Sequence, residues 1–273
     1  MKTIIAPTDF SSVSLNAVNY AAEMAVALNA ELLLINVVQI PVTVSEGSLT
    51  EYEFSEMTED AEQKLVHLSN QLSLLTRDKI NIHTKIMIGG VAQKLKEICK
   101  HREPIAVVMG TKGTGAAEHF FAGSNTLYAV ANLESMVLVV PQNVSFKGIK
   151  KIALASDLKE VPEDESLKLL KEWLLNFNAT IDIINVCEQN NIKTDTVSGS
   201  ISLLNYLSEF HPQFHFIDRE NVEEGVYEFV EENKPDLLII MPKRRGFFEA
   251  LFHKSQSKQF ILHPRIPILA ISE

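Results

Sequence analysis

Glycines gather in one stretch of this sequence where backbone groups could hold an anion. The stretch Met109–Thr126, MGTKGTGAAEHFFAGSNT, contains four of the chain's eleven glycines. It follows an apolar run and ends in the helical pattern Leu127, Val130 and Ala131. Glycine allows the backbone N–H groups to approach a ligand closely, and a helix N-terminus presents unpaired N–H groups with a partial positive charge. Together these features predict an anion cradle.

A carboxylate stands at the end of another apolar run, in Pro7-Thr8-Asp9. A carboxylate accepts hydrogen bonds from hydroxyl or amine donors, whereas amides and hydroxyls donate to phosphate. Each assignment has an alternative without a ligand. Asp9 could cap the helix that comes after it, the glycines could be turn residues, and Ser124 could be a plain helix N-cap.

The elements that must position these residues alternate between strand and helix. Strand-like apolar runs are expected at Thr3–Ala6, Glu31–Val37, Ile82–Ile86, Ile105–Met109 and Met136–Val140. Between the first two, apolar residues from Val13 to Leu28 recur at helical spacing after Ser11 or Ser12, either of which could cap the helix. Such alternation predicts a five-stranded parallel sheet with helices on both faces. Ligands bind these α/β sheets beyond the carboxyl ends of the strands, where the strand order reverses.

An internal duplication sets the domain organisation. Lys2–Val38 and Lys150–Cys187 both run from Lys through a short apolar strand, a small residue and Asp, an amphipathic helix and Asn-Ala to Ile-Asn-Val. The polar segment Gln142–Gly148 separates the two copies. The sequence therefore predicts two domains, residues 1–142 and 148–273.

Composition limits the classes of function. The chain has 273 residues, of which 46% are apolar and 22% charged, and its formal net charge is −10. That charge argues against nucleic acid as a partner, because phosphate backbones are held by clustered Lys and Arg. The N-terminus lacks the apolar segment of a signal peptide and no apolar run reaches membrane-spanning length, so we expect a cytoplasmic protein with no membrane contact.

The glycine stretch matches neither of two common nucleotide motifs. A Walker A loop requires Lys and Ser or Thr where Ala116 and Ala117 follow Gly115, and a dinucleotide fingerprint requires a glycine where Glu118 stands. Catalytic motifs such as G-x-S-x-G and H-E-x-x-H do not occur in the sequence. With no evident base to orient water, we expect at most slow ATP hydrolysis.

The spacing G-x2-G-x9-G-[ST] resembles the nucleotide-binding signature of the universal stress proteins. It is formed here by Gly110, Gly113, Gly123 and Ser124. The duplicated chain resembles a tandem member of that family, which implies two Rossmann-like domains. The resemblance also implies an adenine nucleotide, usually ATP, with the question of Mg²⁺ left open. The residues to which it assigns that ligand are Pro7, Thr8, Asp9, Val37, Val38, Met109, Gly110, Gly113, Gly123, Ser124 and Asn125.

The second copy departs from this pattern. Met241 matches Met109, but Pro242 stands for Gly110 and Arg245 for Gly113. Proline removes a backbone donor, and larger residues occupy space that a phosphate would need. We therefore expect no ATP site of the family's type in residues 148–273.

The two terminal apolar runs, Met136–Val140 and Pro267–Ile271, would each leave a sheet edge to be covered. Members of the family with a single domain commonly dimerise through that edge. The resemblance therefore implies antiparallel pairing of the two runs within one chain, as an intramolecular pseudo-dimer, with further homo-oligomers open. We expect an ATP-binding stress-response protein with an unidentified protein partner. The alternatives are a nucleotide-free scaffold and an adenylate-forming or ATP-pyrophosphatase enzyme.

Overall fold

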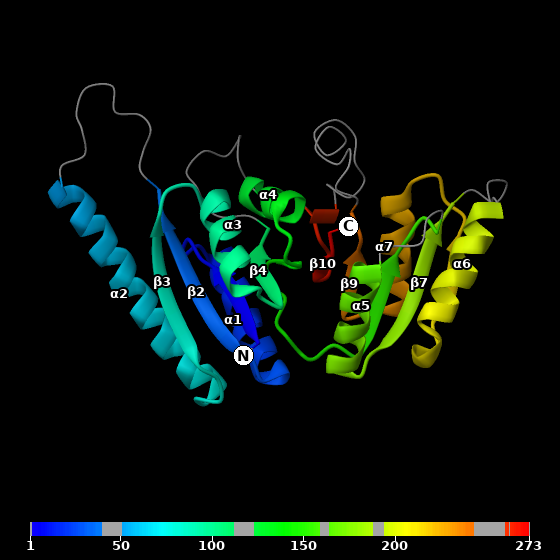
Figure 1. The fold of residues 1–273 in the computed structure, drawn as a ribbon, viewed down its shortest axis with the longest axis horizontal. Coiled ribbons are helices and arrows are strands. Elements are labelled where there is room, and N and C mark those ends of the chain that lie inside the picture. Colours follow the sequence, from blue (N-terminus) through cyan, green and yellow to red (C-terminus); the bar gives the residue numbers. More distant parts are fainter. Residues whose placement is uncertain are drawn as a thin grey trace, which may run out of the picture. The chain divides into compact units, whose positions relative to one another are not determined.

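The structure is a computed structural model of the chain (Figure 1). It describes residues 2–39, 51–111, 123–158, 164–187, 194–242, 260–261 and 263–272. The chain divides into two compact units, Met1–Phe146 and Lys147–Glu273.

The first unit is a parallel sheet with the strand order β3-β2-β1-β4-β5. Its elements in chain order are β1 (Thr3–Pro7), α1 (Ser12–Leu28), β2 (Glu31–Val38), α2 (Glu51–Thr76), β3 (Ile82–Ile88), α3 (Val91–Arg102), β4 (Ala106–Gly110), α4 (Ser124–Asn132) and β5 (Val137–Val140). All five expected strands are present, with bounds shifted by one or two residues. The strand order reverses at β1, which lies between β2 and β4.

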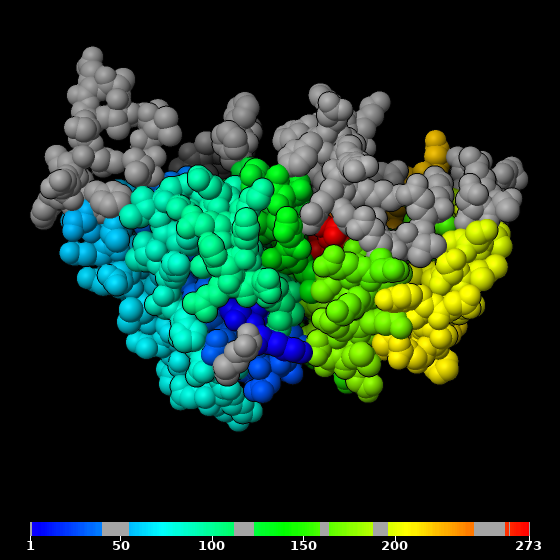
Figure 2. Space-filling view, viewed as in Figure 1, coloured from blue at the N-terminus to red at the C-terminus, as the bar shows by residue number. Residues whose placement is uncertain are grey.

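Helices cover both faces of this sheet. Right-handed crossovers place α1 and α2 on one face and α3 and α4 on the other, and within each pair the two helices contact each other. In the space-filling view the segment around α3 forms much of the face of the first unit that is turned toward the reader (Figure 2). Strands β1, β4 and β5 are buried almost throughout, which is why their sequences are continuous apolar runs.

The second unit repeats this arrangement with the order β10-β9-β6-β7-β8, again parallel. Its elements are β6 (Lys151–Ala155), α5 (Asp164–Phe177), β7 (Thr180–Val186), α6 (Thr194–Tyr206), a 3₁₀ turn (Ser208–Phe210), β8 (Gln213–Ile217), α7 (Val222–Asn233), β9 (Leu237–Ile240) and β10 (Ile268–Ala270). Strands β5 and β10 each end the strand order of their own unit. The pairing expected between these two strands stays a prediction.

The duplication extends to the way in which the first helix of each unit ends. Asn29 and Asn178 both have left-handed backbone, with φ of 50° and 49°. The next residue, Ala30 or Ala179, then donates its backbone N–H to a carbonyl of the last helical turn, at 2.9 and 3.0 Å. Asparagine tolerates this conformation better than most residues. The repeated Asn-Ala pair in the sequence is thus a helix stop that aims the chain into the second strand.

Candidate functional site

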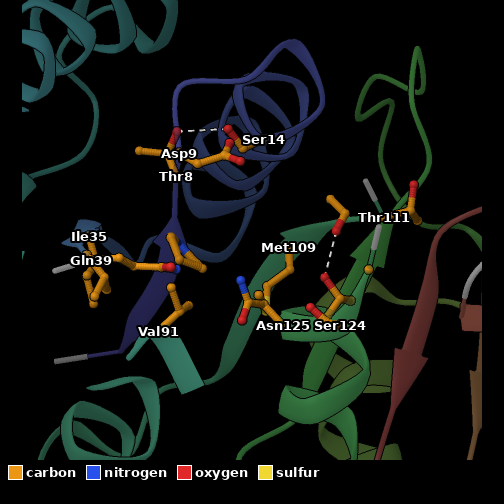
Figure 3. Close-up of a pocket in the computed structure, with 15 residues that line it drawn as sticks. Thr8, Asp9, Ser14, Ile35, Gln39, Val91, Met109, Thr111, Ser124 and Asn125 are labelled. Atoms are coloured by element: carbon orange, nitrogen blue, oxygen red, sulfur yellow. Dashed lines mark hydrogen bonds between the residues drawn. The ribbon is translucent and has the colours of Figure 1, made fainter. Parts of the chain in front are cut away.

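A cleft of about 590 Å³ opens at the carboxyl ends of β1, β2 and β4, where the strand order reverses. Figure 3 shows its two sides: Thr8 and Asp9 lie in the turn after β1 and Ser14 in the first turn of α1, whereas Ser124 and Asn125 lie at the start of α4. The residues that line it are Pro7, Thr8, Asp9, Ser14, Ile35, Val37, Gln39, Val91, Met109, Gly110, Thr111, Gly123, Ser124, Asn125 and Thr126. Residues from six elements and their connections therefore meet in one space.

Hydrogen bonds fix Thr8, the first residue after β1. Its backbone N–H donates to the Ile35 carbonyl at 2.8 Å, and its own carbonyl accepts from the Asn36 side-chain amide, also at 2.8 Å. Its hydroxyl lies 3.0 Å from the Ser14 hydroxyl and accepts from the Phe10 N–H at 3.0 Å. Since both its backbone and its side chain are held, the turn that carries Asp9 has a defined position over the sheet.

The turn after Thr8 presents the Asp9 carboxylate at the mouth of the cleft. Ser11, not Asp9, is the N-cap of α1, because its hydroxyl accepts from the Ser14 N–H at 3.2 Å. The Asp9 carboxylate instead accepts from the Ser11 N–H at 3.0 Å, across a turn in which Phe10 has left-handed backbone with φ of 62°. Asp9 itself is exposed, so its remaining acceptor positions face the cleft and solvent.

Two opposing effects act on the pKa of Asp9. Partial burial raises it, whereas hydrogen bonds from the hydroxyls of Ser11 and Ser14 and from the Ser11 N–H lower it. The hydrogen bonds outweigh the burial, so the pKa of Asp9 lies below its ordinary value of 3.8. The side chain is therefore a carboxylate at neutral pH and acts solely as a hydrogen-bond acceptor.

Gly110 has a packing role that does not depend on a ligand. A Cβ atom at this position would lie 2.6 Å from Val13 Cγ1 and 2.8 Å from the Val13 carbonyl oxygen. Any other residue would push α1 away from β4. The Gly110 carbonyl also accepts from the Thr126 hydroxyl at 2.8 Å, which ties the start of α4 to the end of β4. Gly110 therefore sets the distance between the two sides of the cleft.

Helix α4 begins at the cleft without a side-chain cap. Its N-cap is Gly123, with φ of 91°, a conformation that L side chains rarely adopt. Gly123 has no side chain to accept from the first N–H groups of the helix, as Ser or Asp would. The first turn also contains no acidic residue. The positive dipole end of α4 therefore lies beside the cleft, with no cap side chain or acidic side chain to offset it.

Comparison with known proteins identifies the family to which the chain belongs. The model of the universal stress protein family matches residues 1–141. The chain belongs to the universal stress protein family. A universal stress protein of Methanocaldococcus jannaschii is 31% identical over 144 residues, which cover 51% of this chain and 81% of that protein.

Solved structures show a similar fold along the whole length of the chain. The crystal structure of a universal stress protein from Archaeoglobus fulgidus superposes with a TM-score of 0.77 at 15% identity, covering 99% of this chain and 98% of that one. A functionally unknown protein from Pseudomonas aeruginosa superposes with a TM-score of 0.61 at 12% identity, covering 100% and 92%. At these identities the likeness shows the fold alone.

The structure brings together most of the residues that the family signature indicates. Nine of the eleven line the cleft: Pro7, Thr8, Asp9, Val37, Met109, Gly110, Gly123, Ser124 and Asn125. Val38 is not among the lining residues and is 7% exposed; it neighbours Val37 on β2, where successive side chains point to opposite faces. Gly113 lies outside the described residues.

Six lining residues were not anticipated from the sequence: Ser14, Ile35, Gln39, Val91, Thr111 and Thr126. Two-residue periodicity along β2 could have found Ile35 from Val37. Thr111 and Thr126 come directly after residues that the signature names. Ser14 and Val91 give no local signal, because the packing of α1 and α3 brings them to the cleft.

The described residues contain few other features that suggest chemistry. They include no group of three or more His, Cys, Asp and Glu side chains that could hold a metal ion. Within the same described ranges, no helix is both long and apolar enough to cross a membrane. In the second unit Met241 and Pro242 are described, whereas Arg245 and the basic residues around it lie outside the described ranges.

Proposed function

We propose that the first unit of this universal stress protein binds ATP as a regulatory ligand. One observation carries the proposal: a single cleft joins the ionised carboxylate of Asp9 to the N-terminus of α4, where the dipole is positive and the N-cap is glycine. Its volume of about 590 Å³ lies within the roughly 300–1,000 Å³ of pockets that hold molecules of this size. The two ends of the cleft have opposite hydrogen-bonding character, as a nucleoside phosphate requires.

The ligand would lie with its adenosine toward β1 and β2. Ile35, Val37 and Met109 supply apolar surface for a base, and Asp9 supplies an acceptor for ribose hydroxyls. The phosphates would then point toward Gly123, Ser124 and Asn125, whose N–H groups and side chains can donate. The opposite orientation would place phosphates against the carboxylate, which like-charge repulsion disfavours.

The same lining supports a binding role rather than a catalytic one. Among the described residues that line the cleft, Asp9 is the single ionisable side chain. Rapid phosphoryl transfer needs groups that orient a nucleophile and stabilise developing charge. Mg²⁺ would accompany the phosphates, with water and the nucleotide as its main ligands. The proposal includes a cytoplasmic stress response in which the nucleotide state alters contact with a protein partner.

Two methionines allow the proposal to be tested with site resolution. Met109 lines this cleft, and Met241 lines a separate cleft in the second unit. We expect ATP to shift the ¹³C-methyl NMR signal of Met109 in the full chain while the Met241 signal stays in place. Met109→Leu and Met241→Leu variants assign the two signals, and calorimetry should give about one ATP per chain.

Some results would contradict the proposal. The proposal would be contradicted if calorimetry found two equivalent sites, or if the NMR signal of Met109 did not shift at millimolar ATP. A nucleotide-free scaffold would give the second result while still binding its partner. Release of pyrophosphate in the presence of an acceptor molecule would indicate the adenylate-forming alternative instead.

A further inference from the structure

The second unit has its own cleft, of about 170 Å³, at the carboxyl ends of β6, β7 and β9. Two of the residues that line it are polar, Ser156 and Asp157. The others are apolar: Ala155, Ile184, Val186, Val222, Val226, Ile240, Met241 and Phe260. All belong to the second unit, so this cleft is independent of the one proposed to bind ATP.

The floor and one side of this cleft correspond to those of the first unit. Ser156 follows β6 as Thr8 follows β1, and it is held in the same way. Its N–H donates to the Ile184 carbonyl at 3.0 Å, its carbonyl accepts from the Asn185 amide at 3.0 Å, and its hydroxyl accepts from the Leu158 N–H at 3.1 Å. Leu158 has the left-handed backbone of Phe10, with φ of 56°. The turn therefore presents Asp157 at the mouth of the cleft as its counterpart presents Asp9.

The opposite side is different. Gly123, Ser124, Asn125 and Thr126 line the first cleft there, whereas Phe260 lines the second. Phe260 is 4% exposed and its ring lies edge-on to Tyr227, with centroids 5.2 Å apart. Next to Met241 stands Pro242, which has no backbone N–H to offer. The described lining of this cleft therefore includes an aromatic wall, and the positions that correspond to Gly123–Thr126 lie outside the described residues.

The volume and the lining limit what the second cleft could hold. A cavity of roughly 150 Å³ with apolar walls accommodates benzene, so about 170 Å³ has room for one ring system but not for a whole nucleotide. Phe260 can make offset or edge-to-face contact with a ring. The Asp157 carboxylate can accept from an N–H donor and would repel an anion.

We propose that the cleft of the second unit binds a small aromatic amine, that is, one ring that carries an N–H donor and no anionic group. The apolar side chains enclose the ring, and Asp157 accepts from the amine at the mouth. Binding here does not require ATP in the first unit, and the absence of ATP binding there would leave this proposal standing.

The test uses the full chain and a pair of probes of similar size and opposite charge, benzylamine and benzoate. The ¹³C-methyl signal of Met241 reports on this cleft, and that of Met109 reports on the first. We expect benzylamine to shift the Met241 signal at millimolar concentration and benzoate to leave it unchanged.

Matched variants locate the binding. Val222 and Val91 are half-buried first residues of α7 and α3, and each lines one cleft. Val222→Phe should fill the second cleft and weaken the effect of benzylamine on Met241 at least tenfold, whereas Val91→Phe should leave it intact. Asp157→Asn keeps the shape of the side chain and removes its charge, so it should also weaken binding about tenfold.

Three outcomes would overturn the proposal. The first is no Met241 shift with benzylamine in a folded chain. The second is a shift that both Val222→Phe and Asp157→Asn leave unchanged, because binding would then lie elsewhere. The third is a larger shift with benzoate than with benzylamine. That result would assign an anion site to this end of the unit, where the sequence continues with Lys243, Arg244 and Arg245.

Discussion

The two units have a similar hydrogen-bonded turn after their first strand, but residues of different types line the opposite side of each cleft. Thr8 and Ser156 share three hydrogen bonds, through the backbone N–H, the carbonyl and the hydroxyl, and Thr8 makes a further one with the Ser14 hydroxyl. Asn36 and Asn185 hold the two turns from the second strand. The clefts nevertheless measure about 590 and 170 Å³. A strand-end aspartate in this fold is therefore part of a scaffold, and it does not by itself indicate a nucleotide.

The two units differ in the residues that come after the fourth strand of each. In the first unit Gly110 lets α1 approach β4, and the Thr126 hydroxyl ties α4 to the same strand. The helix N-terminus therefore lies beside the cleft. In the second unit Phe260 lines the cleft, and Pro242 occupies the sequence position of Gly110. If the contrast is functional, changes at the α4 side should affect nucleotide binding far more than changes in the shared turn.

The largest effect is expected from a negative charge at the start of α4. Ser124→Glu should weaken ATP binding roughly a hundredfold or more, about 3 kcal/mol, because the carboxylate would face the phosphates. Glutamate is favourable in the first turn of a helix, so the fold should tolerate the change. Calorimetry measures the affinity, and circular dichroism checks the fold.

Ser124→Gln is the matched control, because it has nearly the same size and no charge. It should alter the affinity only a few-fold. If Ser124→Glu binds ATP as tightly as the unchanged protein, the phosphates do not lie at α4. The difference between the two clefts would then not be explained by nucleotide binding at the start of α4. Replacing Gly110 would be a poor test, because the clash with Val13 changes packing and binding together.

Much of the fold and part of the site could be predicted from the sequence, because both depend on local patterns. Buried strands such as β4 and β5 are continuous apolar runs, and the repeated Asn-Ala pair marks equivalent helix ends. The signature residues Gly123 and Ser124 lie where a helix begins. Each of these features is set by a few neighbouring residues.

The remaining site features depend on contacts between distant segments. The family resemblance assigned the backbone of both Val37 and Val38 to the ligand, and of these two residues Val37 is in the lining of the cleft. Position 110 requires glycine because Val13, which lies 97 positions earlier (110 − 13), packs where a Cβ atom would be. Phe260 lines the second cleft and packs against Tyr227, which lies 33 positions earlier (260 − 227).

An intermediate effect is expected from the two asparagines that hold the shared turn. Asn36→Ala should reduce the free energy of unfolding by about 2 kcal/mol, because it leaves the buried Thr8 carbonyl without this donor. Asn185→Ala should cost less, about 1 kcal/mol or below. The side-chain oxygen of Asn185 is buried without a hydrogen-bond partner among the described residues, and the substitution removes that unfavourable group as well.

Denaturant titration can separate the two units in this comparison. The chain's single tryptophan, Trp173, is buried in α5 and reports on the second unit, whereas circular dichroism follows both. Asn185→Ala should move the fluorescence transition to a lower denaturant concentration. Asn36→Ala should leave the fluorescence transition in place and move the circular dichroism transition of the first unit to a lower denaturant concentration. A larger cost for Asn185→Ala than for Asn36→Ala would mean that the two turns are not equivalent.

The smallest effect is expected from the Asp9 carboxylate, and it depends on pH. Because the pKa of Asp9 is lowered in the folded chain, ionised Asp9 stabilises the fold at every pH above the ordinary value of 3.8. That contribution should disappear as the pH falls through the lower pKa of the folded state. Asp9→Asn should therefore be slightly less stable than the unchanged protein from pH 5 to pH 8, by less than about 1 kcal/mol since the side chain is exposed. The difference should close as the pH falls below 3.8 and through the lower pKa of the folded state. Measuring the free energy of unfolding of both proteins across this range tests the sign. A difference that grows on acidification would mean that burial outweighs the hydrogen bonds from Ser11 and Ser14, so that the pKa of Asp9 is raised in the folded chain.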